Sequence, residues 1–405
     1  MEVYIGIDWS KEKHDVAYMN SAGSVIAYQT IAASPVGYAA LDARRQQLGA
    51  QLEECWIGIE TVHNLVLDDL VRRGYPHLYL IPPSLVKDSR GRFGESKANS
   101  DRKDAQLLAD LLRTDRVRLH PWQPDSCVTQ QMAVQVSLES FLTSSIIRVT
   151  NRLRNGLWRY YPNAAQVFSS LDTQIALEFI CAYPTPQQAQ ALTFEAFRAF
   201  AQQHHYPNRK KLPACYARLQ QPQPEPALST LLAYQPEAVY LAQLALQLVQ
   251  HRVKVQKSIQ DLFAQHPDAT IFASLPGAGE KLAPALLTKF GDDRQRFPTP
   301  ASLQAQAGTC PYTKASGKRR RVLFRHACDK EFRTIAQQWA RASLDLSPWA
   351  TAYFHTVLPR CQSTSQAYRC LANRWLAIAW RLWQDRKPYN ETYHLHQHAL
   401  RAKPM

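Results

Sequence analysis

The sequence feature that most constrains the fold is a short apolar run that ends in a carboxylate and occurs twice. Residues 3–8 read Val-Tyr-Ile-Gly-Ile-Asp, and residues 55–60 read Cys-Trp-Ile-Gly-Ile-Glu. Apolar runs of this length with β-branched residues are typical of strands buried on both faces of a sheet. The pattern therefore places Asp8 and Glu60 at the carboxyl edge of a sheet, where open α/β folds bind their ligands.

The segments around these two runs predict an α/β domain. Further strands are expected at residues 14–19, 24–31 and 77–81, and helices at residues 35–48, 64–73 and 100–113. Ser34 is the expected N-cap of the first helix, and Pro35 occupies its first position. Three strands in a meander, followed by strand, helix and strand, is the order of an RNase H-like sheet. We expect such a domain over residues 1–122.

Four carboxylates are candidates for a single metal site. Asp8 and Glu60 end strands that should be neighbours, whereas Asp101 and Asp104 lie three residues apart at a helix start and share one face. Converging carboxylates repel one another unless they hold cations, and oxygen-only ligands select Mg²⁺ or Mn²⁺ over zinc. Two such ions, about 4 Å apart, can activate the attacking group and stabilise the leaving oxygen in phosphodiester cleavage. The alternative for Asp101 and Asp104 is that they only cap their helix.

A helical region is expected over residues 123–269. A helix over residues 126–161 carries basic residues on one face with aromatic residues beside them. The basic residues are Arg148, Arg152 and Arg159, and the aromatic residues are Trp158, Tyr160 and Tyr161. Such a stripe can follow a phosphate backbone and stack bases, although a solvated helix face has the same pattern.

The second half of this helical region divides into a connector and a long helix. Residues 184–236 are rich in Pro and Gln and contain a basic Asn-Arg-Lys-Lys cluster, so we interpret them as an insert or loose connector with short helices. Residues 237–266 form one helix with an apolar heptad row. The row consists of Leu241, Leu248, Val255 and Leu262. This seam can pair two chains as a coiled coil in a homo-oligomer, which we favour, or pack inside one chain.

The C-terminal domain is expected to be mainly helical over residues 270–393. Its entry, Leu-Pro-Gly-Ala-Gly at residues 275–279, resembles a helix-hairpin-helix motif, in which backbone N–H groups at Gly277 and Gly279 would meet phosphates. The alternative is a plain turn between helices. Residues 394–405 are expected to be a solvated tail. Its three histidines, His394, His396 and His398, could bind metal by their spacing.

A second candidate site is the hydroxyl of Ser316, which precedes Gly317 and a basic run. The run consists of Lys318, Arg319, Arg320 and Arg321. A serine beside glycine is accessible, and the cations can bind a phosphate. Alone the pattern is weak, because Ser-Gly in a basic loop is commonly just a turn.

Charge and cysteine usage restrict the class of protein. The 405 residues carry a net charge of +15, which favours a polyanionic partner such as nucleic acid over a merely basic surface. Eight cysteines occur without a Cys-x-x-Cys pair, as expected for reduced thiols in the cytoplasm. No run approaches the roughly 20 apolar residues of a membrane span, and the N-terminus lacks the order of a signal peptide.

These motifs together resemble the DEDD-type insertion-sequence transposases. The resemblance rests on Gly-Ile-Asp at residues 6–8, Ile-Glu at 59–60, Ser-Asp-Arg-Lys-Asp-Ala at 100–105, Leu-Pro-Gly-Ala-Gly at 275–279, Phe-Pro at 297–298, Ala-Gly at 307–308 and Ser-Gly at 316–317. It covers roughly residues 1–120 and 270–385. The family's architecture is a RuvC-like, RNase H-type domain, a helical coiled-coil region and a C-terminal transposase domain.

The resemblance also implies a chemistry and a set of partners. It implies a composite site in which Ser316 is the nucleophile that becomes joined to DNA. The residues implied to bind Mg²⁺ or Mn²⁺ are Asp8, Glu60, Asp101 and Asp104. The implied partners are the element's donor and target DNA and a structured guide RNA, called a bridge RNA, in a prokaryotic, nucleoid-associated dimer or tetramer. Two alternatives stay open: a metal-dependent Holliday-junction nuclease that uses water instead of Ser316, and an inactive nucleic-acid-binding protein.

Overall fold

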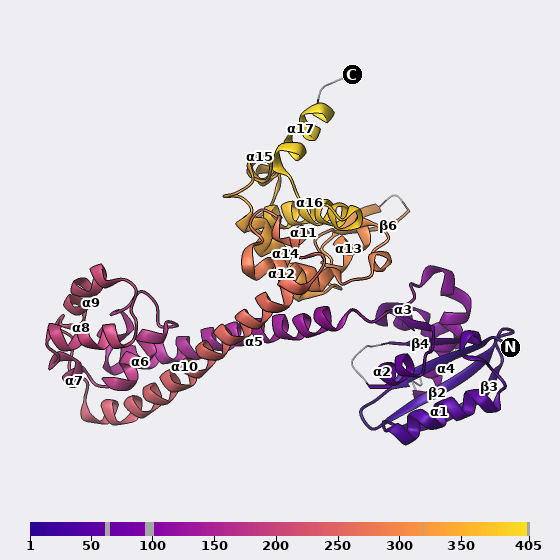
Figure 1. Ribbon diagram of the computed structural model, residues 1–405, viewed down its shortest axis with the longest axis horizontal. Helices are drawn as coiled ribbons and strands as arrows, with labels where there is room; N and C mark the ends of the chain where they lie inside the picture. Colours follow the sequence, from indigo (N-terminus) through magenta and orange to yellow (C-terminus); the bar gives the residue numbers. More distant parts are fainter. Residues whose placement is uncertain (61–64, 94–100, 318, 403–405) are drawn as a thin grey trace. The chain divides into compact units, whose positions relative to one another are not determined.

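The computed structural model describes residues 1–60, 65–93, 101–317 and 319–402 (Figure 1). Lys318 and the predicted helix starts at residues 64 and 100 lie outside the described residues. The chain forms two compact units, one of Met1–Asp125 with Asp293–Pro298 and the other of Ser126–Asp292 with Thr299–Met405. No described helix is long and apolar enough to cross a membrane.

The first unit is built on a mixed five-stranded sheet, so the predicted α/β class of the N-terminal region is confirmed. Its strands are β1 (Val3–Trp9), β2 (Lys13–Asn20), β3 (Val25–Ala32), β4 (Cys55–Ile59) and β5 (His77–Leu80). Their order is β3-β2-β1-β4-β5, in which β1 pairs antiparallel with β2 and parallel with β4. The two carboxylate-ended runs are therefore adjacent central strands, as the sequence predicts.

Helices flank this sheet: α1 (Pro35–Gln47), α2 (Leu65–Arg72), α3 (Pro83–Ser89) and α4 (Asp101–Asp115). The sheet is buried on both faces, because Ile5 and Ile7 pack in a core with α1 and α2, whereas Tyr4 packs in a second core with α4. The contact between α4 and β1 requires Gly6. A Cβ at Gly6 would lie 2.0 Å from the carbonyl oxygen of Ala105. Glycine at this position lets the first turn of α4 approach the carboxyl half of β1.

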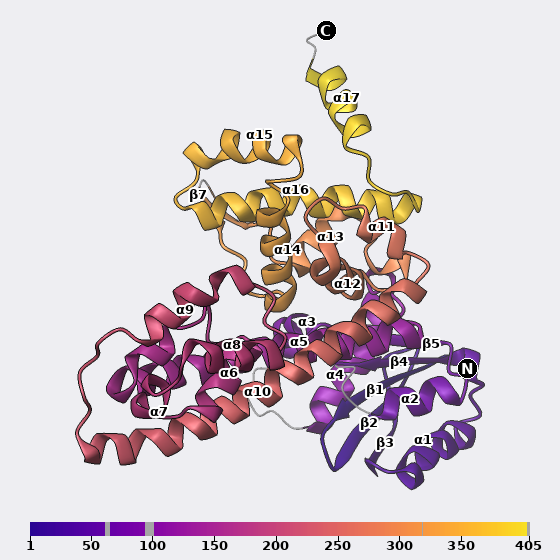
Figure 2. The same cartoon turned by 60° about the vertical axis from the view of Figure 1, so that its left-hand side comes forward.

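Two long antiparallel helices dominate the first part of the second unit (Figures 1 and 2). They are α5 (Cys127–Tyr160) and α10 (Leu228–Gln265). The Nε2 atom of Gln256 donates to Glu139 at 3.2 Å near one end of the pair, and Arg152 contacts Glu237 at 2.6 Å toward the other. In the predicted heptad row of α10, Leu241 and Val255 are buried whereas Leu248 and Leu262 are half-buried. Since α10 packs on α5 of the same chain, the seam is used at least in part within one chain.

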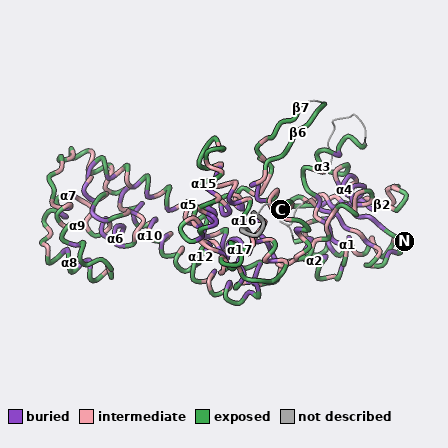
Figure 3. The backbone as a smooth tube through the Cα atoms, turned by 90° about the horizontal axis from the view of Figure 1, so that it is seen from above, coloured by how far each residue is buried: buried purple, intermediate pink, exposed green. Residues whose placement is uncertain are grey.

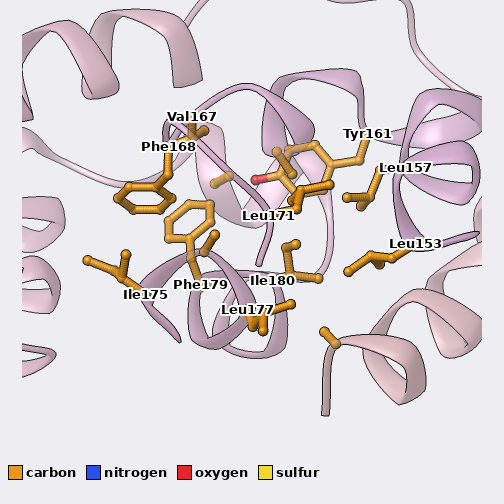
Figure 4. Packing of buried hydrophobic residues seen from close by; sticks show 14 of the residues in the cluster. Leu153, Leu157, Tyr161, Val167, Phe168, Leu171, Ile175, Leu177, Phe179 and Ile180 are labelled. Carbon is orange, nitrogen blue, oxygen red and sulfur yellow. The ribbon is translucent and has the colours of Figure 1, made fainter. Parts of the chain in front are cut away.

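Residues 184–236 contain the short helices that the sequence predicts, but these helices pack into a core and do not form a loose connector. Four helices, α6 (Gln174–Ala182), α7 (Pro186–Gln190), α8 (Phe194–Gln203) and α9 (Leu212–Leu219), share one apolar core with the ends of α5 and α10 (Figure 4). Phe179 is central to this core and meets Phe168 and Phe197 edge to face. The helix α10 also begins nine residues earlier than residue 237 and contains Pro236, because burial against α5 and α6 outweighs the lost backbone hydrogen bond.

The remainder of the second unit is helical apart from one hairpin. Its elements are α11 (Ala269–Ala273), α12 (Gly279–Phe290), α13 (Pro300–Gln306), β6 (Tyr312–Ser316), β7 (Arg319–Leu323), α14 (Lys330–Ala342), α15 (Pro348–Val357), α16 (Thr364–Asp385) and α17 (Glu391–Ala402). Trp339 and Trp375 are fully buried between α14 and α16, and the indole N–H of Trp375 donates to Ser343 at 2.8 Å. The predicted tail from residue 394 is helical up to Ala402, and His394 packs on Trp349 with ring centroids 4.6 Å apart.

A half-buried carboxylate, Asp292, connects the start of α5 to the end of α12. Asp292 accepts hydrogen bonds from the backbone N–H of Ser126 and from the Thr129 hydroxyl, and its Oδ1 lies 2.8 Å from Nε2 of His266. Burial alone would raise its pKa, but the hydrogen bonds with His266, Ser126 and Thr129 lower the pKa of Asp292 to about 2. Asp292 thus stays ionised and holds three helix ends together.

Candidate functional site

Asp8 and Glu60 lie side by side at one edge of the sheet. In the parallel pair of β1 and β4, Ile7 lies opposite Ile59, so the next residue of each strand is a carboxylate at the same edge. Both side chains are half-buried. This geometry is the one that the two repeated runs predict.

The start of α4 adds the other two predicted carboxylates to this edge. Asp101 and Asp104 occupy the first turn of α4, and Asp104 directly precedes the Ala105 carbonyl that packs on Gly6. Burial, and then the charges of Asp104, Asp101, Glu60 and Asp15, raise the pKa of Asp8 to about 7. The four predicted carboxylates are therefore close enough to interact electrostatically, from three separate elements of the unit.

Three charged residues that the motif does not include also face this group. Asp15 lies directly opposite Asp8 in the antiparallel pair of β1 and β2. The Nζ atom of Lys13 lies 3.8 Å from Asp101 and also 3.8 Å from Asp15. The guanidinium of Arg90 lies 3.1 Å from Asp104. The register of the first hairpin could have identified Asp15 and Lys13 from the sequence, because a short turn after Asp8 places residues 13–15 beside it.

The donor chemistry of this group fits a hard divalent cation. All four predicted ligands are carboxylates, which suit Mg²⁺ or Mn²⁺. Burial, and then repulsion from the neighbouring carboxylates, raise the pKa of Asp8, and such a cation would offset that repulsion. Within the residues that the structure describes, however, no three His, Cys, Asp or Glu side chains lie close enough together to hold an ion. Side-chain adjustment is therefore required before these carboxylates could share one.

Ser316 lies at the tip of the β6–β7 hairpin, in the second unit. It is the last residue of β6 and pairs with Arg319, the first residue of β7. Gly317 follows with a φ of 54°, the left-handed conformation that two-residue hairpin turns need at their first position. Ser316 is exposed, and Figure 3 shows both strands in the green of exposed residues. The basic loop that the sequence indicates is thus a β-hairpin, with Arg319, Arg320 and Arg321 in its second strand.

The predicted basic face of α5 is exposed but partly neutralised. Arg148 is exposed and donates to Ser145, Arg152 pairs with Glu237, and the Arg159 guanidinium lies 5.7 Å from the ring centre of Tyr234. The aromatic residues expected beside this basic face differ in their exposure. Trp158 is 52 % exposed, whereas Tyr160 and Tyr161 are buried in the apolar core and cannot stack on bases. Figure 4 shows Tyr161 in this core. The helical period turns Tyr160 toward the apolar side of α5.

The glycine turn between α11 and α12 has a structural explanation at Gly277. A Cβ at Gly277 would lie 2.5 Å from the backbone of Ala342 and Ser343 at the end of α14, and its φ is 78°. Gly279 has a φ of 52° but open space around it. Gly277 is therefore needed for packing whether or not the turn meets a phosphate.

The packing explanation predicts that substitution of the two glycines changes the stability of the protein by different amounts. Gly277→Ala is expected to destabilise the protein by about 3 kcal/mol, because a backbone clash adds to the cost of the left-handed conformation. Gly279→Ala is the matched control and should cost only about 1 kcal/mol. Urea unfolding followed by circular dichroism measures both. A Gly277→Ala variant with wild-type stability and weakened DNA binding would instead identify a phosphate contact.

The second unit also contains a hollow of about 860 Å³ where α5, α10, α12 and α14 meet. Lys281 lies in it, 3.2 Å from the buried carboxylate of Glu139, which also accepts from Gln256. None of the predicted catalytic or nucleic-acid-binding residues lines this hollow. The ion pair of Lys281 on α12 with Glu139 on α5 thus joins the long helices to the C-terminal helices beside this hollow.

Comparison with known proteins matches both ends of the chain to transposases. A family model described as "Transposase" matches residues 5–162, and one described as "Transposase IS116/IS110/IS902 family" matches residues 269–355. The "Mini-circle putative transposase for IS117" of Streptomyces coelicolor is 30% identical over 401 residues, which is 96% of each chain. The insertion element IS110 uncharacterized 43.6 kDa protein of the same species is 25% identical, over 95% of this chain and 94% of its own. The insertion element IS900 uncharacterized 42 kDa protein of Mycobacterium paratuberculosis is 24% identical, over 96% and 97%.

The matched regions contain the features described above. The first includes the sheet, Asp8, Glu60 and the start of α4, and the second includes the turn at Gly277 and the hairpin with Ser316. One relative is similar along nearly the whole length of both chains. The protein therefore belongs to the IS116/IS110/IS902 family of insertion-sequence transposases.

Proposed function

We propose that this transposase is an RNA-guided DNA recombinase that moves its insertion sequence by cutting and rejoining strands through a serine–DNA intermediate. The observation that carries the proposal is the meeting of carboxylates from β1, β4 and α4 around Asp8. Their strand order and position support a RuvC-like, RNase H-type catalytic domain over residues 1–122. The helical region over residues 123–269 and the C-terminal transposase domain over residues 270–393 complete the assignment.

In this proposal Ser316 supplies the attacking oxygen. Its Oγ gives up its proton and forms a bond to the scissile phosphorus while the bond from phosphorus to a deoxyribose oxygen breaks. That oxygen takes up one proton, which balances the one released by the serine, and leaves as a hydroxyl. Reversal of the step with a new deoxyribose hydroxyl frees Ser316 and rejoins the strand. Each step exchanges one phosphoester bond for another, so no external energy source is needed.

The carboxylates have the complementary role. Asp8, Glu60, Asp101 and Asp104 would hold Mg²⁺ or Mn²⁺, which when bound supplies charge stabilisation at the phosphate and acidifies the attacking hydroxyl. An unassisted serine hydroxyl is a weak nucleophile. Among the described residues no histidine pairs with Ser316 in the hairpin to act as its base. The reaction therefore requires that the carboxylates and Ser316 act on the same phosphodiester.

Guide RNA, DNA and a second copy of the chain are the proposed partners. The net charge of +15 supports binding to polyanions, and the exposed guanidinium groups of Arg148 and Arg159 offer contacts on α5. Arg152 can contribute once it separates from Glu237. Homo-oligomerisation and a place in the cytoplasm, near the nucleoid, are part of the same proposal.

The guide-RNA part of the proposal makes a direct prediction. Protein purified from cells that carry the whole element should contain nucleic acid that is sensitive to RNase, and removal of this RNA should abolish recombination. RNA affinity should fall about a thousandfold or more between roughly 50 and 200 mM salt. The reason is that Lys and Arg side chains release the counterions condensed on the phosphates, and added salt opposes this release. Electrophoresis of the extracted nucleic acid, with and without RNase, makes the measurement. Full recombination by RNA-free protein would contradict RNA guidance without affecting the serine mechanism.

A further inference from the structure

The two faces of the β6–β7 hairpin differ in chemistry. Residues directly opposite each other in an antiparallel pair share a face, and successive residues alternate between faces. The pairs Tyr312 with Leu323, Lys314 with Arg321, and Ser316 with Arg319 therefore lie on one face, which we call the Ser316 face. The pairs Thr313 with Val322 and Ala315 with Arg320 lie on the other face.

On the Ser316 face, the two residue pairs nearest the tip of the hairpin each contain at least one basic side chain. Arg319 is directly opposite Ser316, and cross-strand neighbours of this kind have Cβ atoms about 5 Å apart. Lys314 and Arg321 lie two residues further from the tip, a step of about 7 Å along the strands. All three side chains belong to exposed residues. Among the described residues, no acidic side chain forms an ion pair with any of them, so their charge is available to a ligand.

Aromatic rings continue this surface at the base of the hairpin. Tyr312 is 41% exposed, and the guanidinium of Arg325 lies 5.9 Å from its ring centre. Phe324 precedes Arg325 in the chain. The guanidinium of Arg333 lies 4.5 Å from the ring centre of Phe324, and that of Arg369 lies 4.7 Å from it. Backbone oxygens also hold two of these guanidinium groups, because Arg325 donates to the carbonyl oxygen of Cys310 at 3.4 Å and Arg333 donates to that of Arg325. The base therefore adds ordered cations to those of the two strands.

We propose that the Ser316 face is the surface along which the scissile DNA strand lies. Arg319 holds the phosphate that Ser316 attacks, and Lys314 and Arg321 hold the neighbouring phosphates of the same strand. The spacing supports this, because a step of about 7 Å is close to the distance between successive phosphates along one DNA strand, which exceeds the roughly 3.4 Å axial rise per nucleotide. Arg320 belongs to the same basic run but faces away. The inference rests on the proposed function and adds to it the identity of the positioning residues.

The test compares Arg319→Ala and Arg321→Ala with Arg320→Ala. The three variants remove the same charge from adjacent exposed positions of one strand, so their effects on folding should be alike. Binding of a labelled single-stranded DNA oligonucleotide, measured by fluorescence anisotropy over a range of salt concentrations, is the first measurement. Arg319→Ala and Arg321→Ala should each weaken binding about tenfold and reduce the slope of log affinity against log salt by about 0.7. Arg320→Ala should change neither beyond about twofold.

The second measurement is the yield of protein–DNA covalent species after denaturation. It should fall at least tenfold for Arg319→Ala and stay near the wild-type yield for Arg320→Ala. Equal effects of all three substitutions would overturn the inference, as would an asymmetry seen with an RNA oligonucleotide but not with DNA. Loss of the covalent species in Ser316→Ala with equal effects of the arginines would leave the proposed function intact. Asymmetric DNA binding without any covalent species would contradict the proposed function instead.

Discussion

Replacement of Asp8 by asparagine is expected to abolish DNA cleavage, with a loss on the order of a thousandfold or more. The substitution keeps the size of the side chain and removes one carboxylate charge at the point where β1, β4 and α4 meet. It should not unfold the protein. Since burial and four neighbouring carboxylates raise the pKa of Asp8 to about 7, a neutral amide there relieves repulsion, and the melting temperature in the absence of metal should stay the same or rise.

The control for this prediction is Asp68→Asn, at an exposed position on α2 in the same unit. It removes the same charge without touching the carboxylate group and should leave cleavage within about twofold of the wild type. Cleavage of a labelled element-end DNA in Mg²⁺ or Mn²⁺ measures both variants. Asn substitutions at Asp101 and Asp104 test whether those residues are ligands or only helix caps. Full activity of Asp104→Asn would remove that residue from the metal site.

Ser316→Ala is expected to lose strand exchange completely while it keeps DNA and RNA binding. The hydroxyl is at the exposed tip of a hairpin whose register does not depend on it, so only the nucleophile is lost. Electrophoretic mobility shift and a recombination assay on the same preparation separate binding from chemistry. Continued DNA cleavage by Ser316→Ala, with free ends and no strand exchange, would identify a hydrolytic nuclease that uses water.

Thr313 is the alternative hydroxyl in the same strand and serves as the comparison. It lies on the face opposite Ser316, since Thr313 pairs with Val322. Thr313→Val should therefore retain strand exchange within about threefold, the cost of a conservative exposed change. Loss of exchange in Thr313→Val but not in Ser316→Ala would mean that the nucleophile is Thr313.

The N-terminal sheet could be predicted from the sequence because its information is local. Each buried strand is a short apolar run with a turn signal beside it, and the end of each run positions Asp8 or Glu60 directly. The neighbours of that site were harder to identify. The register of the first hairpin places Lys13 near Asp8, but the contact of Lys13 with Asp101, and that of Arg90 with Asp104, depend on where α4 packs, and no short motif encodes them.

The helical region was harder to predict, since its structure depends on packing between distant segments. Residues 184–236 look polar because Pro and Gln dominate them, yet aromatic residues such as Phe197 and Phe200 are sufficient for a core once α5 and α10 are adjacent. Pro236 signals a helix end by its local preference, which the burial of Ala238 and Leu241 overrides. The direction of Tyr160 likewise depends on which side of α5 faces that core.

The covalent intermediate tests the central claim most directly. Wild-type protein with its RNA and element DNA is denatured during the reaction, digested with protease and nuclease, and examined by mass spectrometry for a nucleotide-modified peptide. The account predicts one modified peptide that contains Ser316, with the nucleotide on that side chain. It also predicts that the peptide disappears in Asp8→Asn. A modified peptide in which another residue carries the nucleotide, or efficient recombination with no modified peptide at all, would contradict the account.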